Sequence, residues 1–221
     1  MGLEIIANNL GFFLKGAILT LEISLAAIAL GFALGVPMGL ARISRVLPVR
    51  ALATGYVEAL RGTPLLVQIF IVYFGLPSIG IYLDPLVSGI LAVGLNSAAY
   101  QAEILRGGIQ SVPKGQMEAA RSMGMTYGQS MRRVVLPQAM RLIIPPMTNE
   151  FIILIKDSSL VSAISVWELT LVAKELNAKY FDPFTIFLFV AAVYFIMTFA
   201  TSKILRVVEK KTAIPGFGAG D

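Results

Sequence analysis

Residues 118–137 read EAARSMGMTYGQSMRRVVLP, a polar and basic segment that lies between two apolar stretches of the chain. Residues 116–123 have the composition of a short helix. Gly124 can end that helix, because a left-handed turn there needs a residue without a Cβ. Pro137 suits the first turn of a following helix. The segment is therefore predicted to form a short helix, a turn and the start of a longer helix.

The flanking stretches indicate a membrane protein. The chain is 57% hydrophobic and only 14% charged, whereas a soluble domain of this length carries about 25% charged residues. A membrane helix needs about 20 predominantly apolar residues, and five stretches are long enough. They are residues 16–41, 58–83, 85–106, 139–160 and 183–205. We therefore expect an all-α integral membrane protein.

The remaining segments complete the expected organisation. Residues 1–15 should form an external N-terminal segment, and residues 16–208 the transmembrane domain. Within that domain, residues 107–138 form a cytoplasmic loop, and residues 209–221 follow as a cytoplasmic tail. Thirteen of the 18 basic residues fall in the connections on one side of the five spans or at the span ends that adjoin them. Because cytoplasmic connections are enriched in Lys and Arg, the N-terminus is predicted outside and the C-terminus in the cytoplasm.

Several chemistries are excluded or disfavoured by composition. The chain has no cysteine and no histidine, which removes thiol nucleophiles, the usual zinc sites and imidazole acid–base catalysis. It contains no G-x-x-x-x-G-K-[ST] phosphate-binding loop. Residues 218–221, GAGD, match the GxGD string of intramembrane aspartyl proteases, but they lie outside any predicted span. We expect no enzymatic activity, no metal and no cofactor on this chain.

The loop resembles the EAA loop of bacterial ABC importer permeases, whose pattern is E-A-A, three residues, G, nine residues, I-x-L-P. Val134 stands in place of the isoleucine. In that family the short helix docks into a cleft on the ATP-hydrolysing subunit. The resemblance thus implies six residues that couple the permease to its ATPase: Glu118, Ala119, Ala120, Arg121, Met123 and Gly124.

Three further segments resemble one group of permeases within this family. Residues 61–68 (RGTPLLVQ), 96–103 (NSAAYQAE) and 156–162 (KDSSLVS) are similar to permeases for histidine, glutamine, glutamate and arginine. The resemblance implies a type I permease of five transmembrane helices in the bacterial cytoplasmic membrane. It also implies its partners: two ATPase subunits that bind ATP and Mg²⁺, a second permease (identical or homologous), an external binding protein and a polar amino acid.

Depth along the predicted spans suggests where substrate contacts the chain. At about 1.5 Å per residue, Asn96 lies about 16 Å into the third span, near the middle of a hydrocarbon core about 30 Å thick, and Glu150 reaches a similar depth. Polar groups there are costly unless they face a cavity or one another. The candidate substrate-binding residues are Asn96, Ser97, Tyr100, Gln101, Asn149 and Glu150. The alternative is that the amides and hydroxyls of the third span only bond neighbouring helices.

The sequence leaves two questions open, one on the class of transporter and one on the substrate. A secondary transporter or a channel would share these midplane polar groups. Within the importer class, Glu150 favours a cationic amino acid only slightly over a glutamine-, glutamate- or opine-type substrate, because this carboxylate could instead bind the α-ammonium that every amino acid carries.

Overall fold

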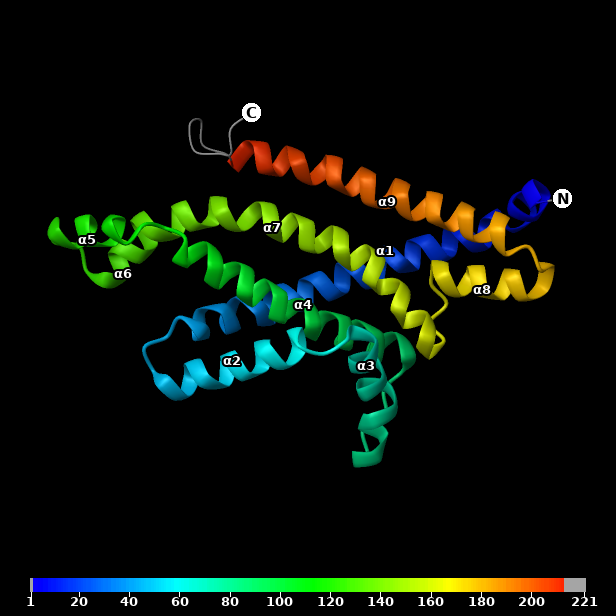
Figure 1. Cartoon of the computed structure of the whole chain (residues 1–221), viewed down its shortest axis with the longest axis horizontal. Coiled ribbons are helices and arrows are strands. Elements are labelled where there is room, and N and C mark those ends of the chain that lie inside the picture. Colours follow the sequence, from blue (N-terminus) through cyan, green and yellow to red (C-terminus); the bar gives the residue numbers. More distant parts are fainter. Residues whose placement is uncertain (1, 213–221) are drawn as a thin grey trace.

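A computed structural model describes residues 2–212, and all regular structure in that range is helical. Four long helices run along a common direction in Figure 1: α1 (Gly2–Arg42), α4 (Pro85–Gln110), α7 (Leu136–Asp157) and α9 (Pro183–Thr212). The short helix α8 (Leu169–Tyr180) lies at the same end as the N-terminus, and α5 (Lys114–Ser122) lies at the opposite end. The fold is therefore an elongated helical bundle with different accessory helices at its two ends.

The first helix is longer than the predicted span. α1 runs unbroken for 41 residues, about 60 Å at 1.5 Å per residue, although only residues 16–41 were predicted to span and residues 1–15 to precede the span. The first turns are helical because their apolar residues pack: Ile6 and Phe13 are buried in a cluster with Val172 of α8 and Ile186 of α9.

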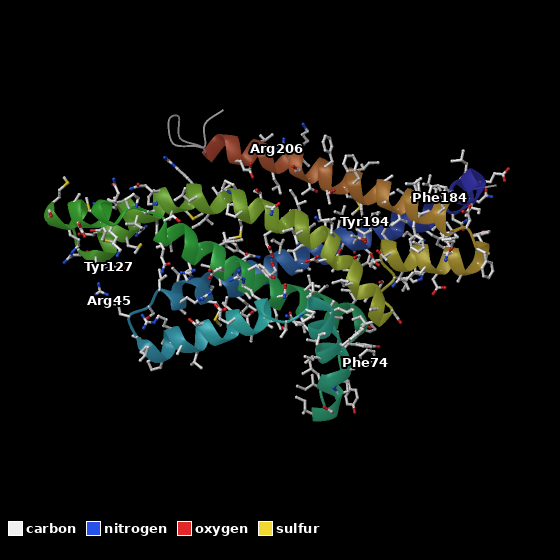
Figure 2. All side chains as sticks on the ribbon, in the orientation of Figure 1. Arg45, Phe74, Tyr127, Phe184, Tyr194 and Arg206 are labelled. Atoms are coloured by element: carbon white, nitrogen blue, oxygen red, sulfur yellow. The ribbon has the colours of Figure 1, made fainter. Side chains whose placement is uncertain are left out.

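The second predicted span, residues 58–83, is not one helix. α2 (Leu47–Arg61) and the run α3 (Leu65–Phe70), η1 (Ile71–Gly75, a π-helical turn) and η2 (Leu76–Ile79, a 3₁₀ turn) meet at a bend of 105°. Pro64 starts α3, and a proline disfavours helical geometry in the residue before it. In Figure 1 the second half projects away from the bundle, and Phe74 on this arm is 62% exposed (Figure 2).

Close approach of α1 and α4 forms the centre of the bundle. Gly31, Gly35 and Gly39 are buried on one face of α1, and a Cβ at Gly35 would lie 2.8 Å from the Ala98 carbonyl oxygen of α4. Small residues at such positions let membrane helices pack backbone to backbone. This contact holds the polar segment around residue 97 in the protein interior.

The long helices differ in how apolar they are. By length and apolarity, α1 and Pro183–Val207 of α9 qualify as membrane spans, and the bent pair α2–α3 is a third if counted as one broken span. α4 and α7 have 26 and 22 residues, about 39 and 33 Å, so they are long enough to cross. Their polar residues lower their apolarity, and several of those residues are buried, including Asn96, Gln101 and Glu150.

The loop after α4 folds as its sequence predicts. Gly124 has a φ of +86°, and the backbone N–H groups of Gly124 and Met125 donate to the carbonyls of Arg121 and Ala120. This pattern is a Schellman cap, and it confirms the predicted end of the short helix. α6 (Tyr127–Ser130) follows with a Thr126–Gln129 capping box, and a π-helical turn, η3 (Met131–Val135), leads into α7, where Pro137 lies in the first turn.

A cation–π contact joins this loop to the connection between α1 and α2. The guanidinium carbon of Arg45 lies 5.2 Å from the centre of the Tyr127 ring, and Figure 2 shows both residues at the end of the molecule occupied by α5 and α6. A cation over an aromatic face contributes about 0.5–1 kcal/mol of stabilising interaction energy at exposed sites. The two basic connections that the sequence assigns to the cytoplasm therefore lie together.

At the other end, the 3₁₀ segment η4 (Ser158–Ile164) leads into α8. Glu168 is fully buried and caps α8 through hydrogen bonds from the N–H groups of Thr170 and Leu171. The Tyr194 hydroxyl of α9 donates to the same carboxylate over 2.8 Å. One side chain thereby holds α8 against the bundle. The predicted tail, residues 209–221, is helical as far as Thr212, and the rest lies outside the described residues.

Candidate functional site

A cavity of about 340 Å³ opens where the α2–α3 bend meets α4 and α7. This volume is at the lower end of the range typical of small-molecule sites, about 300–1,000 Å³. Its lining combines residues of the bend with polar residues of the two long helices. The lining residues are Thr63, Pro64, Leu65, Asn96, Tyr100, Glu150, Ile153 and Asp157. The cavity therefore has size and polarity suited to a small polar molecule.

Side-chain amides stabilise the bend that forms one wall. The Gln68 amide donates to the carbonyls of Leu60 (2.7 Å) and Thr63 (3.1 Å). The Asn96 amide donates to Gln68 Oε1 (2.9 Å) and to Leu60 O (3.2 Å). A broken helix leaves carbonyls without backbone partners, and buried carbonyls need other donors. Gln68 and Asn96 supply those donors and leave Asn96 Oδ1 without a recorded hydrogen bond among the described residues.

A short chain of hydrogen bonds positions Glu150. The Ser97 hydroxyl of α4 donates to Glu150 Oε1 over 3.1 Å, and Gln101 Nε2 donates to Ser97 Oγ over 3.0 Å. Gln101 is 1% exposed and lies against Gly31 of α1. The carboxylate is itself 6% exposed but lines the cavity, so its position depends on α4 and, through Gln101, on α1.

The structure separates the six candidate substrate residues into three groups. Asn96, Tyr100 and Glu150 line the cavity. Ser97 and Gln101 are buried behind it and bond to Glu150 and to each other. Asn149 instead lines a second cavity of about 230 Å³ between α7 and α9, with Thr148, Ser202 and Arg206 among its neighbours. Adjacent residues on a helix point about 100° apart, so Asn149 and Glu150 cannot both face one cavity at that depth.

Sequence reasoning did not include Thr63, Pro64, Leu65, Ile153 or Asp157 among the site residues. The signal for the first three was the Gly62-Thr63-Pro64 run, which breaks the apolar stretch and marks a turn. Asp157 lies seven residues after Glu150, which is two helical turns, and so shares its face of α7. That spacing could have placed both carboxylates in the cavity.

The candidate coupling residues lie on α5 and its C-terminal turn. Glu118, Ala119, Arg121, Met123 and Gly124 are exposed, and Met123 is 80% exposed. They form a surface open to a partner at the end of the molecule. Ala120 is buried, so it packs the helix onto its own loop. The exposed part of the EAA segment is therefore a polar face with one protruding methionine.

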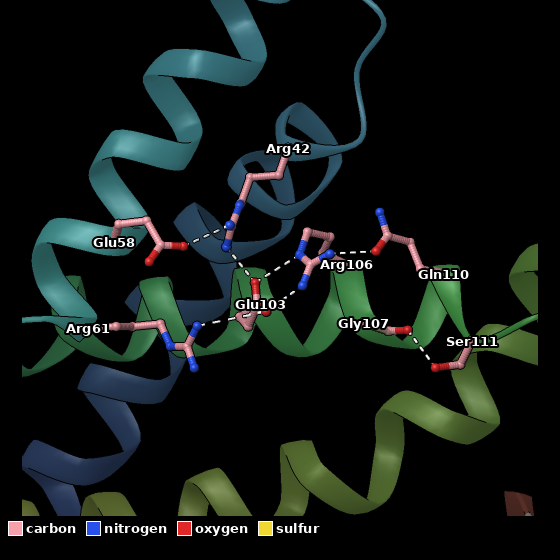
Figure 3. Close-up of polar contacts among 8 residues, drawn as sticks. All are labelled: Arg42, Glu58, Arg61, Glu103, Arg106, Gly107, Gln110 and Ser111. Carbon is pink, nitrogen blue, oxygen red and sulfur yellow. Dashed lines mark hydrogen bonds and ion pairs between the residues drawn. The ribbon is translucent and has the colours of Figure 1, made fainter.

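An ion-pair cluster lies between the cavity and this loop (Figure 3). Glu103 of α4 pairs with Arg42 of α1, with Arg106 one turn away, and with Arg61 of α2 at 3.8 Å. Arg42 also reaches Glu58 of α2 over 3.0 Å. The cluster joins the three helices near the ends of α1 and α2. Glu58 and Arg61, which are three residues apart on α2, pair with Arg42 and Glu103 respectively.

Comparison with known proteins identifies the family. Residues 27–214 match the family model described as binding-protein-dependent transport system inner membrane component. The chain is 39% identical over 211 residues to the probable glutamine ABC transporter permease protein GlnM of Bacillus subtilis, covering 96% of this chain and 98% of that protein. It is 43% identical over 197 residues to the L-cystine transport system permease protein TcyB of the same organism, covering 89% and 84%.

Solved structures of two ABC transporters contain chains with the same fold as this one. A crystal structure of an amino acid ABC transporter with histidines contains a chain 39% identical, with a TM-score of 0.89 over 93% of this chain and 96% of that chain. The inward-facing MetNI methionine ABC transporter has the same fold, with a TM-score of 0.72 at 21% identity over 91% of this chain and 98% of that chain.

The fold and the matches define a membrane-embedded permease subunit of an ABC importer. The chain belongs to the binding-protein-dependent transport system inner membrane component family. It is a multi-pass protein of the bacterial inner membrane and is not itself catalytic, because ATP is bound by ATPase partner subunits. This assignment excludes the alternatives of a secondary transporter and a channel.

Proposed function

We propose that this permease carries polar amino acids inward through the cavity at the α2–α3 bend, with a preference for a cationic side chain. The observation that carries the proposal is the charge of the cavity. Glu150 and Asp157 both line it, and no basic side chain is among its described lining residues. Carboxylates in a poorly hydrated site attract cations strongly, because the low local dielectric strengthens the interaction.

An amino acid with a basic side chain offers two cationic groups. One carboxylate can bind the α-ammonium and the other the side chain, so the two carboxylates match such a substrate better than a neutral one. Asn96 Oδ1 and the Tyr100 hydroxyl add acceptors on the α4 side of the cavity. Relatives named for the arginine transport system (ArtQ, Bacillus subtilis) and the nopaline transport system (NocM, Agrobacterium fabrum) are 36% and 38% identical to the chain.

A glutamine-like substrate is the second candidate. The relative named for glutamine, GlnM, aligns with 96% of the chain. In this case Glu150 would bind the α-ammonium, and Asn96 would contribute to binding the side-chain amide. The two candidates differ in whether affinity depends on the charge of the substrate side chain.

For the assembly, we infer a complex with a second permease (identical or homologous), two ATPase subunits and an external binding protein. The exposed residues Glu118, Ala119, Arg121 and Met123 would contact the ATPase, with Gly124 shaping the turn. The second permease would contact the projecting arm, which extends away from the bundle of this chain (Figure 1). We infer an external N-terminus and a cytoplasmic C-terminus from the distribution of basic residues.

Uptake by the reconstituted complex tests the proposed substrate. Permease, ATPase and binding protein are placed in proteoliposomes, and ATP-dependent uptake of labelled arginine, histidine, glutamine and glutamate is compared. We expect arginine or histidine to be taken up best. Uptake of glutamine alone would favour the second candidate, and preference for glutamate would contradict the charge argument.

A further inference from the structure

The charges of the cavity leave one group of any amino-acid substrate without a partner. An α-amino acid carries a carboxylate as well as an ammonium. The cavity lining presents two carboxylates, and the described residues that line it include no basic side chain. A substrate carboxylate in this poorly hydrated site would be repelled by Glu150 and Asp157 and would need a cation nearby. The ion-pair cluster of Figure 3 contains arginines that could supply that cation.

Arg61 is the basic residue of the cluster that reaches the cavity wall. Its guanidinium carbon lies 5.3 Å from the centre of the Tyr100 ring, and Tyr100 lines the cavity. Arg61 is also the last residue of α2, only two positions before Thr63, where the chain begins to line the cavity. Figure 3 shows its side chain extending from the end of α2 toward α4.

Arg61 is the most weakly held arginine of the cluster. Arg106 donates two hydrogen bonds to Glu103, through Nε over 2.9 Å and through Nη2, and Arg42 donates a third. Both Glu103 oxygens are thus already bonded, and Arg61 approaches only to 3.8 Å. The structure records no hydrogen bond from Arg61 to any described residue, and its side chain is 35% exposed. None of its five N–H groups makes a hydrogen bond to a described residue, so the guanidinium can turn from Glu103 to another carboxylate.

We infer that Arg61 is a further substrate-binding residue, whose guanidinium pairs with the α-carboxylate of the amino acid in the cavity. This inference rests on the proposed function, since it requires an amino-acid substrate. A guanidinium presents two parallel N–H groups that match a carboxylate. Leaving Glu103 costs little, because long, partly exposed ion pairs contribute only about 0–1 kcal/mol and Glu103 keeps its bonds to Arg42 and Arg106. The substrate would then lie with its ammonium toward Glu150 and Asp157 and its carboxylate toward α2.

The test compares two ligands that differ only in the carboxylate. Arginine and agmatine (arginine without its α-carboxylate) are measured for binding to the complex of permease and ATPase subunits in nanodiscs, without the binding protein. If histidine is the better ligand, histidine and histamine replace them, and if glutamine is, its decarboxylated amine is used. The readout is the ratio of the two Kd values, which a loss of folded protein does not change.

We expect Arg61→Gln to weaken arginine binding about tenfold, equivalent to about 1.4 kcal/mol, and agmatine binding less than about twofold. Arg61→Lys keeps the charge but loses the paired donors, so it should restore part of the difference. Arg45→Gln is the control, since it removes an arginine that lies over Tyr127, outside the cluster; its ratio should equal the wild-type ratio.

Three results would overturn the inference. Equal losses for both ligands in Arg61→Gln would show that Arg61 supports the fold of the site. Unchanged Kd values for both ligands in Arg61→Gln would place the carboxylate elsewhere. The same change of ratio in Arg45→Gln would assign the effect to the overall positive charge at this end of the permease. If the wild-type complex binds no amino acid of the panel, the proposed function fails as well, which distinguishes the two failures.

Discussion

The Ser97 hydroxyl of α4 donates a hydrogen bond to Glu150 of α7 over 3.1 Å, so a neighbouring helix orients the carboxylate in the cavity. The same hydroxyl accepts a hydrogen bond from Gln101, which is buried against α1. The position of Glu150 therefore depends on the packing of three helices. Any movement of α7 relative to α4 would shift the position of this carboxylate in the cavity.

Glu150→Gln should lower ATP-dependent uptake of a basic amino acid by roughly five- to tenfold, about 1–1.4 kcal/mol. The substitution keeps size and hydrogen bonding while it removes the charge. Uptake is measured in proteoliposomes, and co-purification with the ATPase checks assembly. Asn149→Ala, in the separate cavity between α7 and α9, is the control and should leave the preference for cationic over neutral substrates unchanged. Normal uptake of the basic substrate by Glu150→Gln would mean that Glu150 is structural.

Ser97→Ala should raise the KM for the same substrate by roughly two- to tenfold, because one intramolecular hydrogen bond contributes about 0.5–1.5 kcal/mol. The effect should depend on Glu150. In the double variant with Glu150→Gln, Ser97→Ala should have a much smaller effect. Additive effects of the two substitutions would contradict the orienting role of Ser97.

Gly124→Val should weaken the attachment of the ATPase. Gly124 has a φ of +86°, and a Cβ added there would have no neighbour within 4 Å, so the substitution acts through the backbone alone. A left-handed conformation costs a residue with a Cβ roughly 1–2 kcal/mol, and more if it is β-branched. Stimulated ATPase activity and the amount of ATPase retained on the permease during purification are the measurements.

Gly115→Val is the matched control, because Gly115 lies in α5, the helix that ends just before Gly124, with equal space and without a positive φ. It should retain the ATPase as the wild type does. A Gly124→Val complex that assembles and transports at the normal rate would show that this turn is not needed for coupling.

Gly35→Ala should destabilise the permease. A Cβ at this position would lie 2.8 Å from the Ala98 carbonyl oxygen, and overpacking of this kind costs about 1–3 kcal/mol. The Tm in detergent should fall by roughly 2–8 °C. Gly11→Ala in the same helix is the control, since Gly11 has no atom within 4 Å of a new Cβ, and its Tm should stay the same or rise slightly. Equal Tm values would contradict the close α1–α4 contact.

Single cysteines at Ser111 and Ala178 should react from opposite sides of the membrane. The chain has no native cysteine, and both positions are exposed. In intact cells, an impermeant maleimide should label Ala178→Cys, and Ser111→Cys only after permeabilisation. Labelling of both, or of Ser111→Cys alone, would contradict the proposed orientation.

The sequence alone was sufficient to predict the class of the protein and the positions of its local turns. A deficit of charge over about 20-residue stretches predicts membrane helices, because the bilayer imposes one length and one polarity on each crossing segment. Gly124 and Pro137 predicted the end and the start of helices correctly, since both effects depend on the conformation of single residues. Residues 118–137 also carried the family resemblance, and the comparisons confirmed it.

Only the tertiary structure decided which polar residues meet. Asn96, Ser97 and Gln101 lie within two turns of one helix, yet one lines the cavity and two are buried behind it, because α7 and α1 approach α4 from different sides. The pairing of Arg61 with Glu103 and of Glu58 with Arg42 depends on where α2 returns beside α1 and α4. Periodicity assigns a residue to a face of its own helix, but it contains no information on which helix covers that face, since that is set by packing between segments far apart in the chain.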